Sequence, residues 1–367
     1  MSIGATGRKV VVSAFGETPL EAVEQHLSLE PQAPPDPATL GPRDVVVAVR
    51  SAAVGWVDLL MASGQYQHMA APPYTPGLEY SGVVAWAGPE AAGVAVGDRV
   101  YVDGLLAGPR SLGPYQAYGG FASYAVAPAE AVRPLPAHWS FDQGCCLLGN
   151  YETAWHCLVA RGQLRAGETA LVHGASGSTG LAAVHVAKLV GATVIATGRS
   201  AEKLAVVQAQ GADHVVCTAG GAGFRDAVKA LTGGRGVDVV YDGVGGDTSV
   251  ESLRCVRFGA RFLIVGWAST PAVAKGKGGR GAPNANVLPT NLIMMKGLDV
   301  LGCPTAISTH LDPGIRAARL RSIMAWVDAG QLSPFVEKSY PMDAVRDAMR
   351  AKWQSRFVGG CVLRPAE

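Results

Sequence analysis

Residues 168–199 (ETALVHGASGSTGLAAVHVAKLVGATVIATGR) constrain the fold more than any other stretch of the chain. They open with a short apolar run at 169–173, which has the length that a buried parallel strand needs. A turn of small residues follows at 174–180, then apolar residues at helical spacing, and then a second apolar run at 193–197. This order predicts a strand–turn–helix–strand unit, the building block of a parallel sheet covered by helices.

The turn at 174–180 predicts a binding site for phosphate groups. The N–H groups at a helix start are unpaired, and the helix dipole adds partial positive charge there. A pyrophosphate can approach them only where side chains are small. Ala175, Gly177 and Gly180 have the spacing of a dinucleotide fingerprint, with alanine in place of the first glycine. Glycine-rich turns also join many strands to helices without binding a ligand, so the turn alone leaves both interpretations open.

Composition excludes several classes of protein. The chain has 367 residues, enough for two domains with real cores, of which 49% are hydrophobic and 16% charged. A formal net charge of +2 gives no electrostatic reason to expect a nucleic-acid or membrane partner. No apolar run has the length of a membrane span and the N-terminus does not resemble a signal peptide, so we expect a soluble, cytoplasmic protein. The seven cysteines are odd in number and contain no C-x-x-C pair, which argues against a disulfide framework or a zinc cluster.

The periodicity of the chain changes near residue 151. Before it, strand-like runs at 10–14, 44–54, 80–87, 99–103 and 121–127, with a short helix at 58–63, predict a partly open barrel. After it, strands at 169–173, 193–197, 214–217, 237–242, 260–265 and 298–302 alternate with helices near 178–190, 201–210, 222–232 and 246–257. This alternation predicts a doubly wound parallel sheet with helices on both faces.

The C-terminal part is expected to return to the β-rich domain, with a helix at 312–329, a strand at 335–340, a helix at 342–350 and a strand at 357–363. The predicted domains are therefore 1–150 with 304–367, and 151–303 inserted between them, with a cleft where the two meet. The segment 268–287 is glycine-rich, basic and aperiodic. It is either a flap that closes over a ligand or a disordered loop.

The end of the second strand of the sheet favours NADPH over NADH. An NAD-specific fold places Asp or Glu there to bind the ribose hydroxyls. Here the strand ends in Thr197, Gly198, Arg199 and Ser200, Lys203 follows, and the nearest acid already lies in the helix. Arg199, Ser200 and Lys203 can bind a 2′-phosphate through charge-assisted hydrogen bonds. Basic residues at a helix start are also common on protein surfaces, which is the alternative.

Several further motifs, taken in order, resemble one family. They are PGLEYSGVV at 76–84, GDRV at 97–100, GFASY at 120–124, TAW at 153–155, VDVVYDGVGG at 237–246 and KG at 296–297. Over nearly its whole length the chain resembles the medium-chain dehydrogenase/reductase superfamily, in the zinc-free branch of quinone oxidoreductases and enoyl reductases. The resemblance implies an α/β fold that joins a GroES-like, partly open β-barrel domain to a doubly wound Rossmann-type parallel sheet domain.

The resemblance also implies catalysis without a metal. The zinc alcohol dehydrogenases of this superfamily carry a histidine where this chain has Leu78, and their metal-binding cysteine falls near Gly55. Without these ligands a zinc ion has nothing to bind. The expected reaction is therefore hydride transfer from NADPH to a small molecule, either a quinone or the C=C bond of an α,β-unsaturated carbonyl compound.

The resemblance places Tyr66 where mitochondrial enoyl reductases have a tyrosine proton donor. The alternative is an aromatic residue that only packs against the substrate. Gly55, Trp56 and Trp267 are the expected substrate pocket, and Gly55 replaces an asparagine that many quinone-reductase relatives have near the nicotinamide. Trp56 and Trp267 form either an aromatic clamp on the substrate or part of the core.

The remaining expected cofactor contacts comprise the turn, the strand ends and several positions carried over from the family. Asn150 is expected at the carboxamide or as a turn residue, Thr218 replaces a family tyrosine beside the adenosine phosphate, and Arg356 approaches the same phosphate or makes a surface salt bridge. The others are Thr153, Ala175, Ser176, Gly177, Ser178, Thr179, Gly180, Val244, Gly245, Gly266 and Trp267. His173 and Asp242 are expected to be structural. The strand at 298–302 resembles the edge through which family members form homodimers.

Two other functions stay open from the sequence. One is an NADPH-binding structural or regulatory member of the superfamily with little turnover, which the unusual Gly55 and Trp56 keep in view. The other is an enzyme that reduces quinones by one electron. The identity of the quinone or enoyl substrate cannot be derived from the sequence.

Overall fold

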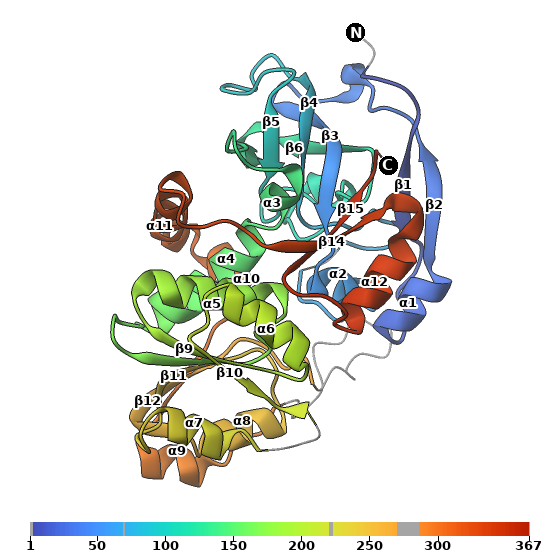
Figure 1. The fold of residues 1–367 in the computed structure, drawn as a ribbon. Helices are drawn as coiled ribbons and strands as arrows, with labels where there is room; N and C mark the ends of the chain where they lie inside the picture. Colours follow the sequence, from blue (N-terminus) through green and yellow to red (C-terminus); the bar gives the residue numbers. More distant parts are fainter. Residues whose placement is uncertain (1–2, 69, 220–222, 270–285, 367) are drawn as a thin grey trace. The chain divides into compact units, whose positions relative to one another are not determined.

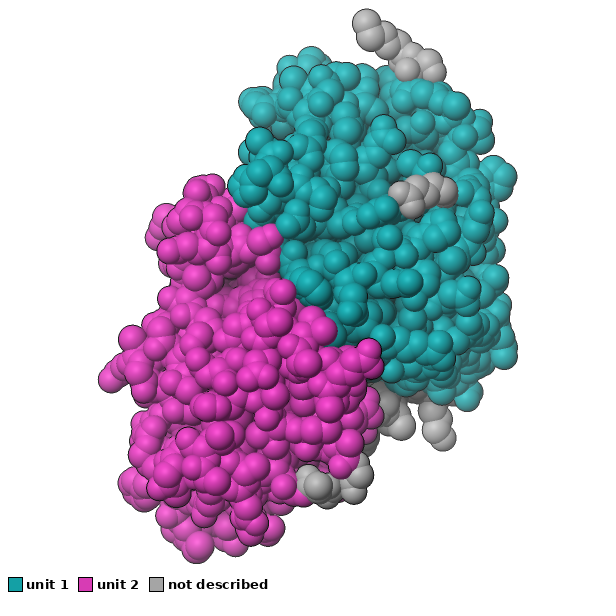
Figure 2. Space-filling model, in the orientation of Figure 1, with its two compact units in different colours: residues 1–149, 272–281, 334–367 teal, residues 150–271, 282–333 magenta. Residues whose placement is uncertain are grey.

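The computed structural model describes residues 3–68, 70–219, 223–269 and 286–366, which form two compact units. Figure 2 colours the two units separately. Within the described ranges, unit 1 contains the residues up to 149 and from 334 onward, and unit 2 contains the residues between them. No helix in the described part of the chain is long and apolar enough to cross a membrane.

Unit 1 contains a two-stranded sheet and a seven-stranded sheet, in which all pairs are antiparallel except β14 with β15. Strand β1 (Gly7–Val12) pairs with β2 (Leu27–Gln32), and helix α1 (Pro19–Gln25) connects them. A seven-stranded sheet has the order β14-β15-β3-β4-β5-β7, with β6 paired to β3. Its strands are β3 (Asp44–Ala53), β4 (Tyr80–Ala87), β5 (Arg99–Val102), β6 (Tyr124–Pro128), β7 (Val132–Pro134), β14 (Val336–Pro341) and β15 (Gly360–Arg364).

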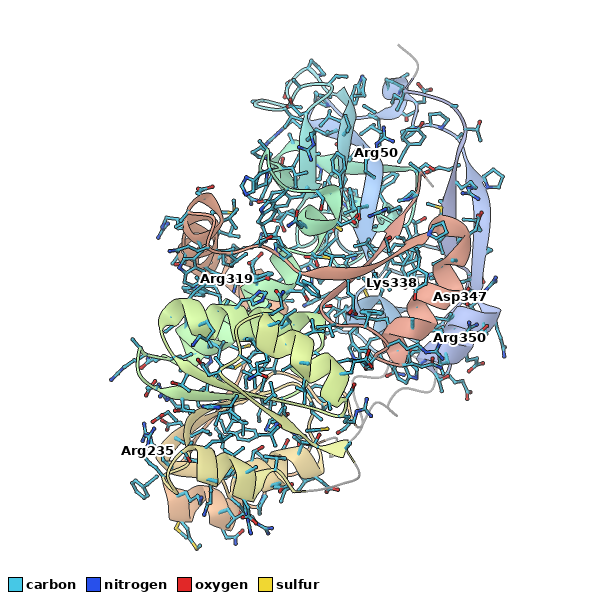
Figure 3. The ribbon with its side chains drawn as sticks, in the orientation of Figure 1. Arg50, Arg235, Arg319, Lys338, Asp347 and Arg350 are labelled. Carbon is cyan, nitrogen blue, oxygen red and sulfur yellow. The ribbon has the colours of Figure 1, made fainter. Side chains whose placement is uncertain are left out.

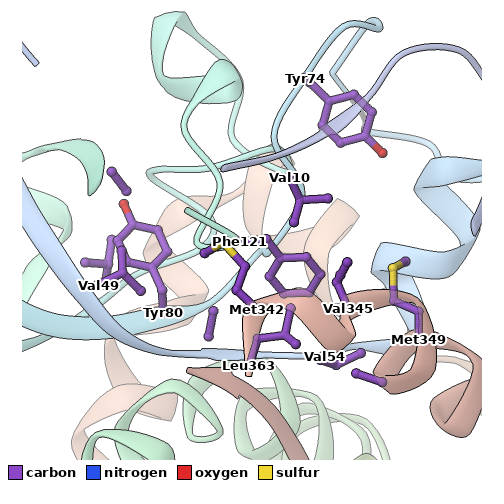
Figure 4. Packing of buried hydrophobic residues seen from close by; sticks show 14 of the residues in the cluster. Val10, Val49, Val54, Tyr74, Tyr80, Phe121, Met342, Val345, Met349 and Leu363 are labelled. Carbon is purple, nitrogen blue, oxygen red and sulfur yellow. The ribbon is translucent and has the colours of Figure 1, made fainter. Parts of the chain in front are cut away.

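The core of unit 1 joins the barrel strands to helices from both ends of the chain. Helix α12 (Val345–Trp353) and helix α2 (Trp56–Ala62) contribute to it, and helix α3 (Phe141–Cys145) packs on β3 and β4. Figure 4 shows Tyr80 and Phe121 packed with Met342, Val345 and Leu363, which all lie in one buried cluster. The C-terminal segment from residue 334 onward therefore belongs to the same hydrophobic core as the first strands.

Unit 2 is a six-stranded, fully parallel sheet in the order β10-β9-β8-β11-β12-β13. Figure 1 labels four of these strands, β9, β10, β11 and β12. The strands are β8 (Thr169–Val172), β9 (Thr193–Gly198), β10 (His214–Cys217), β11 (Val237–Asp242), β12 (Val256–Ile264) and β13 (Asp299–Gly302). The helices between them are α5 (Ser178–Val190), α6 (Ala201–Ala209), α7 (Arg225–Leu231), α8 (Asp247–Ser252) and α9 (Thr290–Lys296). The chain reverses its direction across the sheet between β8 and β11, which is where doubly wound folds bind ligands.

The predicted fold class is confirmed, and the errors lie at element limits. The helix predicted at 246–257 is wrong in extent, because α8 ends at Ser252 and Val256 already pairs with Val237 in the sheet. Gly259 has a φ of 68°, a left-handed conformation that side chains rarely adopt, and lies within β12. A glycine between Phe258 and Ala260, with arginines at 257 and 261, interrupts the apolar run and conceals the start of this strand in the sequence.

Two helices that follow β13 differ from the predicted division of the chain. Helices α10 (Thr305–Leu311) and α11 (Arg316–Asp328) belong to unit 2, whereas the sequence assigned residues 304–333 to the β-rich domain. Helix α11 has two buried arginines, Arg316 and Arg319. Both donate to the carboxylate of Glu152 on helix α4 (Leu148–Trp155), and Figure 3 labels Arg319.

The predicted domain limits stay a prediction. Most of the segment 268–287 lies outside the described residues.

Candidate cofactor and substrate sites

The turn after β8 has the backbone geometry that a phosphate-binding turn requires. Gly174 has a φ of 62°, and the Ala175 N–H donates to Thr197 O at 3.1 Å, which ties the turn to β9. A Cβ added at Gly180 would lie 2.2 Å from Gly174 O, so α5 can start this close to the strand only with glycine there. Gly177 is the N-cap of α5 and offers no side-chain cap to the first turn. The helix start is thus open to an external acceptor.

Asn150 lies at the start of α4 rather than in a loop, which corrects the alternative assignment as a turn residue. The Thr179 hydroxyl donates to Asn150 Oδ1 at 3.2 Å. Ser178 and Thr179 form the first turn of α5, and Thr153 lies one helical turn after Asn150 on α4. Two stretches predicted to contact the cofactor, α4 and the fingerprint turn with Ser176, are therefore brought together within unit 2.

The end of β9 presents a basic and a hydroxyl side chain without an acid. Arg199 is exposed and makes no ion pair with another described residue. Ser200 is the N-cap of α6, and its Oγ accepts a hydrogen bond from the Lys203 N–H at 3.3 Å. Thr218, which follows β10, donates from its N–H to Gly198 O at 2.8 Å. These residues form one corner at the carboxyl edge of the sheet.

Thr197 differs from its neighbours because its side chain points into the core. It is 3% exposed, and its Oγ1 lies 2.7 Å from His173 Nδ1. The His173 Nε2 lies 2.7 Å from the hydroxyl of Ser252, and burial lowers the pKa of His173 to about 4. The expected structural role of His173 is confirmed by these contacts. The Thr197 hydroxyl is hydrogen-bonded to His173, so only the backbone of Thr197 faces the fingerprint turn.

The ends of β11 and β12 are held together by Asp242, whose side chain is fully buried. Its Oδ1 accepts from the N–H groups of Val244 at 2.8 Å and Gly245 at 3.0 Å, and its backbone oxygen accepts from Gly266 N–H at 3.2 Å. Gly245 has a φ of 80°, and an added Cβ would lie 3.0 Å from the backbone of Trp267. Asp242 thus braces the strand end as expected, and it holds three predicted cofactor residues at the carboxyl edge.

In unit 1, Asp58 organises the backbone around Gly55. The Asp58 carboxylate is 1% exposed and accepts hydrogen bonds from Gly55 N–H at 2.8 Å, Gly77 N–H at 2.9 Å and Leu78 N–H at 3.3 Å. Burial raises the pKa of Asp58 to about 6, although the three N–H donors and the charge of Arg110 act in the opposite direction. The backbone at Gly55 and at Leu78 is thus joined by this one carboxylate.

The predicted substrate residues of unit 1 lie on or next to helices. Trp56, the first residue of α2, stacks on Trp353 with ring centroids 5.0 Å apart and an interplanar angle of 6°. This favours the core-packing alternative for Trp56, while Trp267 is 44% exposed in unit 2. Tyr66 is half-buried after α2, and its hydroxyl has no partner among the described residues. Arg356 is exposed and makes no salt bridge within the described part of the chain, so the surface-pair alternative gains no support.

One buried cluster of charged residues could not be predicted from the sequence. Glu152, Arg316 and Arg319 form an ion triad in which all three residues are less than 9% exposed. No sequence signal marks it, because the arginines follow a helical pattern far from Glu152 along the chain. Across the residues that the structure describes, no group of three or more His, Cys, Asp or Glu side chains is placed to hold a metal ion. Zinc independence stays a prediction.

Comparisons with known proteins decide the family. A family model described as the GroES-like domain of alcohol dehydrogenases matches residues 41–137, and one described as zinc-binding dehydrogenase matches residues 178–309. A quinone oxidoreductase-like protein 2 homolog of Nematostella vectensis is 31% identical over 98% of this chain and 90% of its own length. The chain belongs to the medium-chain dehydrogenase/reductase superfamily, in its quinone oxidoreductase branch.

Solved structures of this superfamily match both units. The quinone oxidoreductase of Pseudomonas syringae has a TM-score of 0.77 and 26% identity, and the match covers 98% of this chain and all of that one. A mycobacterial protein solved in complex with NADPH has the same TM-score at 25% identity and the same coverage. The superfamily and the parallel sheet of unit 2 support a nicotinamide cofactor for this chain.

Proposed function

We propose that this protein is an NADPH-dependent, zinc-independent reductase. It transfers hydride to a quinone or to the C=C bond of an α,β-unsaturated carbonyl compound. The observation that carries the cofactor choice is the corner after β9, where an exposed Arg199 and the Ser200 cap occur without an Asp or Glu at the strand end. The relatives support the substrate class, since they include quinone oxidoreductases of animals and bacteria.

The corner after β9 suits a phosphate for electrostatic reasons. An acid at this position would accept the ribose hydroxyls of NADH and would repel a 2′-phosphate. The Arg199 guanidinium has no carboxylate partner among the described residues, so a phosphate would not have to displace one. Lys203 lies on the first turn of α6, where the helix dipole also favours an anion. The pyrophosphate would bind at the start of α5, over Ala175, Gly177 and Gly180.

The reaction needs a hydride donor, a proton and an environment that stabilises developing negative charge. The nicotinamide supplies the hydride when it is bound. For an enone, Tyr66 is the proposed donor of the proton to the α-carbon, and its hydroxyl has no competing partner among the described residues. Gly55, Trp56 and Trp267 are the proposed pocket residues. Thr153, Val244 and Gly266 are proposed to lie along the nicotinamide ribose and ring, and Arg356 near the 2′-phosphate.

We also propose a cytoplasmic homodimer that forms through β13. This strand is at the edge of the parallel sheet, so one row of its backbone N–H and C=O groups has no strand partner within the unit. Sedimentation equilibrium of the purified chain tests this proposal. A monomer at micromolar concentration would contradict it.

The cofactor choice is tested by steady-state kinetics with NADPH and NADH. The kcat/KM for NADPH is expected to exceed that for NADH, and Arg199→Asp is expected to reverse or abolish this preference through loss of phosphate binding. The matched control is Arg254→Asp, because Arg254 is an exposed arginine of the same unit outside the β9 corner. Equal use of both cofactors by the wild type, or an unchanged ratio in Arg199→Asp, would contradict the NADPH assignment.

A further inference from the structure

Cys157 and Cys303 form a thiol pair in unit 2. The π-helix η4 (His156–Arg161) continues α4, and Arg161 at its end donates from Nε to Gly302 O at 3.1 Å. Cys157 lies one helical turn before Arg161, and Cys303 directly follows Gly302. The hydrogen bond between Arg161 and Gly302 ties the two segments together, and each thiol is close enough to the other to shift its pKa. The Cys303 thiol also donates to Leu301 O at 3.5 Å.

Both thiols are held in place by ordered backbone. Cys303 donates from its N–H to Ile264 O at 3.1 Å, which fixes it at the end of β13 beside β12. Helix η4 packs on β12, and a Cβ added at Gly162 would lie 3.0 Å from the Leu263 side chain. Cys157 is fully buried and Cys303 is 5% exposed. The pair therefore rests on two rigid elements, and Cys303 is the less completely buried member.

The surroundings give the two thiols different chemistry. The hydrogen bond from Cys157 and the charge of Arg161 lower the pKa of Cys303, against the effect of burial. Burial, together with the hydrogen bond to Cys303, raises the pKa of Cys157. An oxidant reacts with the thiolate of a cysteine rather than with its thiol, so Cys303 is the expected first target.

We propose that Cys157 and Cys303 are an oxidative modification site that forms a disulfide with hydrogen peroxide as the oxidant. The Cys303 sulfur attacks one peroxide oxygen, the O–O bond breaks, and Cys303 sulfenic acid forms with release of water. The Cys157 sulfur then attacks the Cys303 sulfur, the S–O bond breaks, and a second water leaves. Two thiols are oxidised and one peroxide is reduced to two waters.

The other cysteines of the chain lack this arrangement. Cys217 is exposed, and no second thiol is among the neighbours that shift the pKa of Cys255. Cys361 has Cys145 nearby but no hydrogen bond to it. Cys145 and Cys146 share a hydrogen bond, but a disulfide between adjacent residues closes a small ring that strains the peptide between them. Cys157 and Cys303 come from different elements, so only side-chain rotation and small shifts are needed.

The bond would join the site helix to the sheet edge. Helix α4 carries Asn150 and Thr153, which are proposed to contact the cofactor, and it runs directly into η4 with Cys157. Cys303 directly follows β13, the edge strand of the sheet. Oxidation would therefore fix the end of this helix to a strand that is far from it in the sequence.

Peptide mapping of the oxidised full-length protein tests the proposal. Fully reduced protein is treated with hydrogen peroxide, remaining thiols are alkylated, and a non-reducing digest is analysed by mass spectrometry. A linked peptide that contains Cys157 and Cys303, lighter by two hydrogen atoms than the separate peptides, is expected, with loss of alkylation at both positions. Oxidation of exposed Cys217 in the same sample shows that the reagent has acted.

Two variants keep the test decisive. In Cys157→Ser, the Cys303 sulfenic acid has no resolving thiol and is expected to be trapped by dimedone. Cys255→Ser is the matched control, since Cys255 is also buried in unit 2, and the linked peptide is expected to persist in it. Oxidised Cys217 together with alkylated Cys157 and Cys303, or a linked peptide that pairs other cysteines instead, would overturn the proposal. None of these readouts depends on reductase activity.

Discussion

The hydroxyl of Thr197 and the imidazole of His173 share a buried hydrogen bond of 2.7 Å beneath the fingerprint turn. Ser252 donates its hydroxyl hydrogen to Thr248 O at 2.6 Å, so we assign the Nε2 hydrogen of His173 to the bond with Ser252. His173 Nδ1 then accepts from Thr197. This neutral imidazole is fully satisfied and links β8, β9 and α8 below the proposed cofactor site.

Thr197→Val is expected to lower stability without weakening cofactor binding. Valine keeps the shape of threonine but leaves His173 Nδ1 buried without a donor, which costs about 1–3 kcal/mol. Urea unfolding measures the free-energy change, and fluorescence titration measures the Kd for NADPH. A large rise in Kd with unchanged stability would show that the Thr197 side chain binds the cofactor.

The buried His156 and His173 and the half-buried His185 predict a loss of stability in mild acid. Burial lowers the pKa of His156, His173 and His185 to about 4, below the ordinary value of 6.5. In this range the unfolded chain binds more protons than the folded chain. Stability is therefore complete above pH 6.5 and falls as the pH drops towards 4.

His156→Phe tests this prediction at one site. The His156 Nε2 is buried without a partner among the described residues, so an apolar ring fits its surroundings. Between neutral pH and about pH 5, the free energy of unfolding is expected to fall by on the order of 1–2 kcal/mol less in the variant than in the wild type. His138→Phe, at an exposed position, is the control. Identical pH profiles for His156→Phe and the wild type would contradict the burial of a neutral imidazole.

Asp58 predicts the opposite dependence. Its pKa is raised from 3.8 to about 6 in the folded protein, so the folded chain binds the additional proton. The contribution of Asp58 to stability is complete below pH 3.8 and is lost as the pH rises through 6. As the pH rises from 3.8 to above 6, the free energy of unfolding of the wild type is expected to fall by up to about 3 kcal/mol relative to that of Asp58→Asn. The check is a pair of urea-unfolding series over pH, in which a constant difference between the two proteins would refute the prediction.

Tyr66→Phe is expected to reduce enone turnover about a hundredfold or more, because a positioned proton donor contributes this much. Turnover of a quinone is expected to fall less, since the hydroquinone oxygens can exchange protons with water. The matched control is Tyr118→Phe, in which an exposed tyrosine of the same unit loses its hydroxyl. If kcat with the enone is unchanged in Tyr66→Phe, the residue only packs.

The parallel sheet was predictable because its strands are short apolar runs separated by helical periodicity. Strands β9, β10 and β11 follow the predicted limits within one residue, and the fingerprint turn lies where the spacing placed it. Helices α9 and α10 were not predicted, because Met294 and Leu311 are exposed and their helices show no clear apolar face. Short strands and exposed helices give a weak periodic signal.

The proposed site was predictable for its backbone and less so for its side chains. Gly180 could be identified from spacing because no other residue allows the close contact with Gly174 O. The inward orientation of Thr197 could not, since it depends on His173 and Ser252 from two other elements. The packing of Trp56 could not be predicted either, because its stacking partner Trp353 lies near the far end of the chain.

The measurement that tests the central claim most directly is the fate of the hydride. Purified wild-type protein is supplied with NADPH that carries deuterium at the transferred position, against benzoquinone, phenanthrenequinone, an enone and a short enoyl thioester. We predict oxidation of NADPH with at least one acceptor class and, for an unsaturated carbonyl compound, deuterium at the β-carbon of the product. NADPH that binds by fluorescence but is not oxidised by any acceptor would contradict the reductase assignment, and a semiquinone signal would contradict hydride transfer.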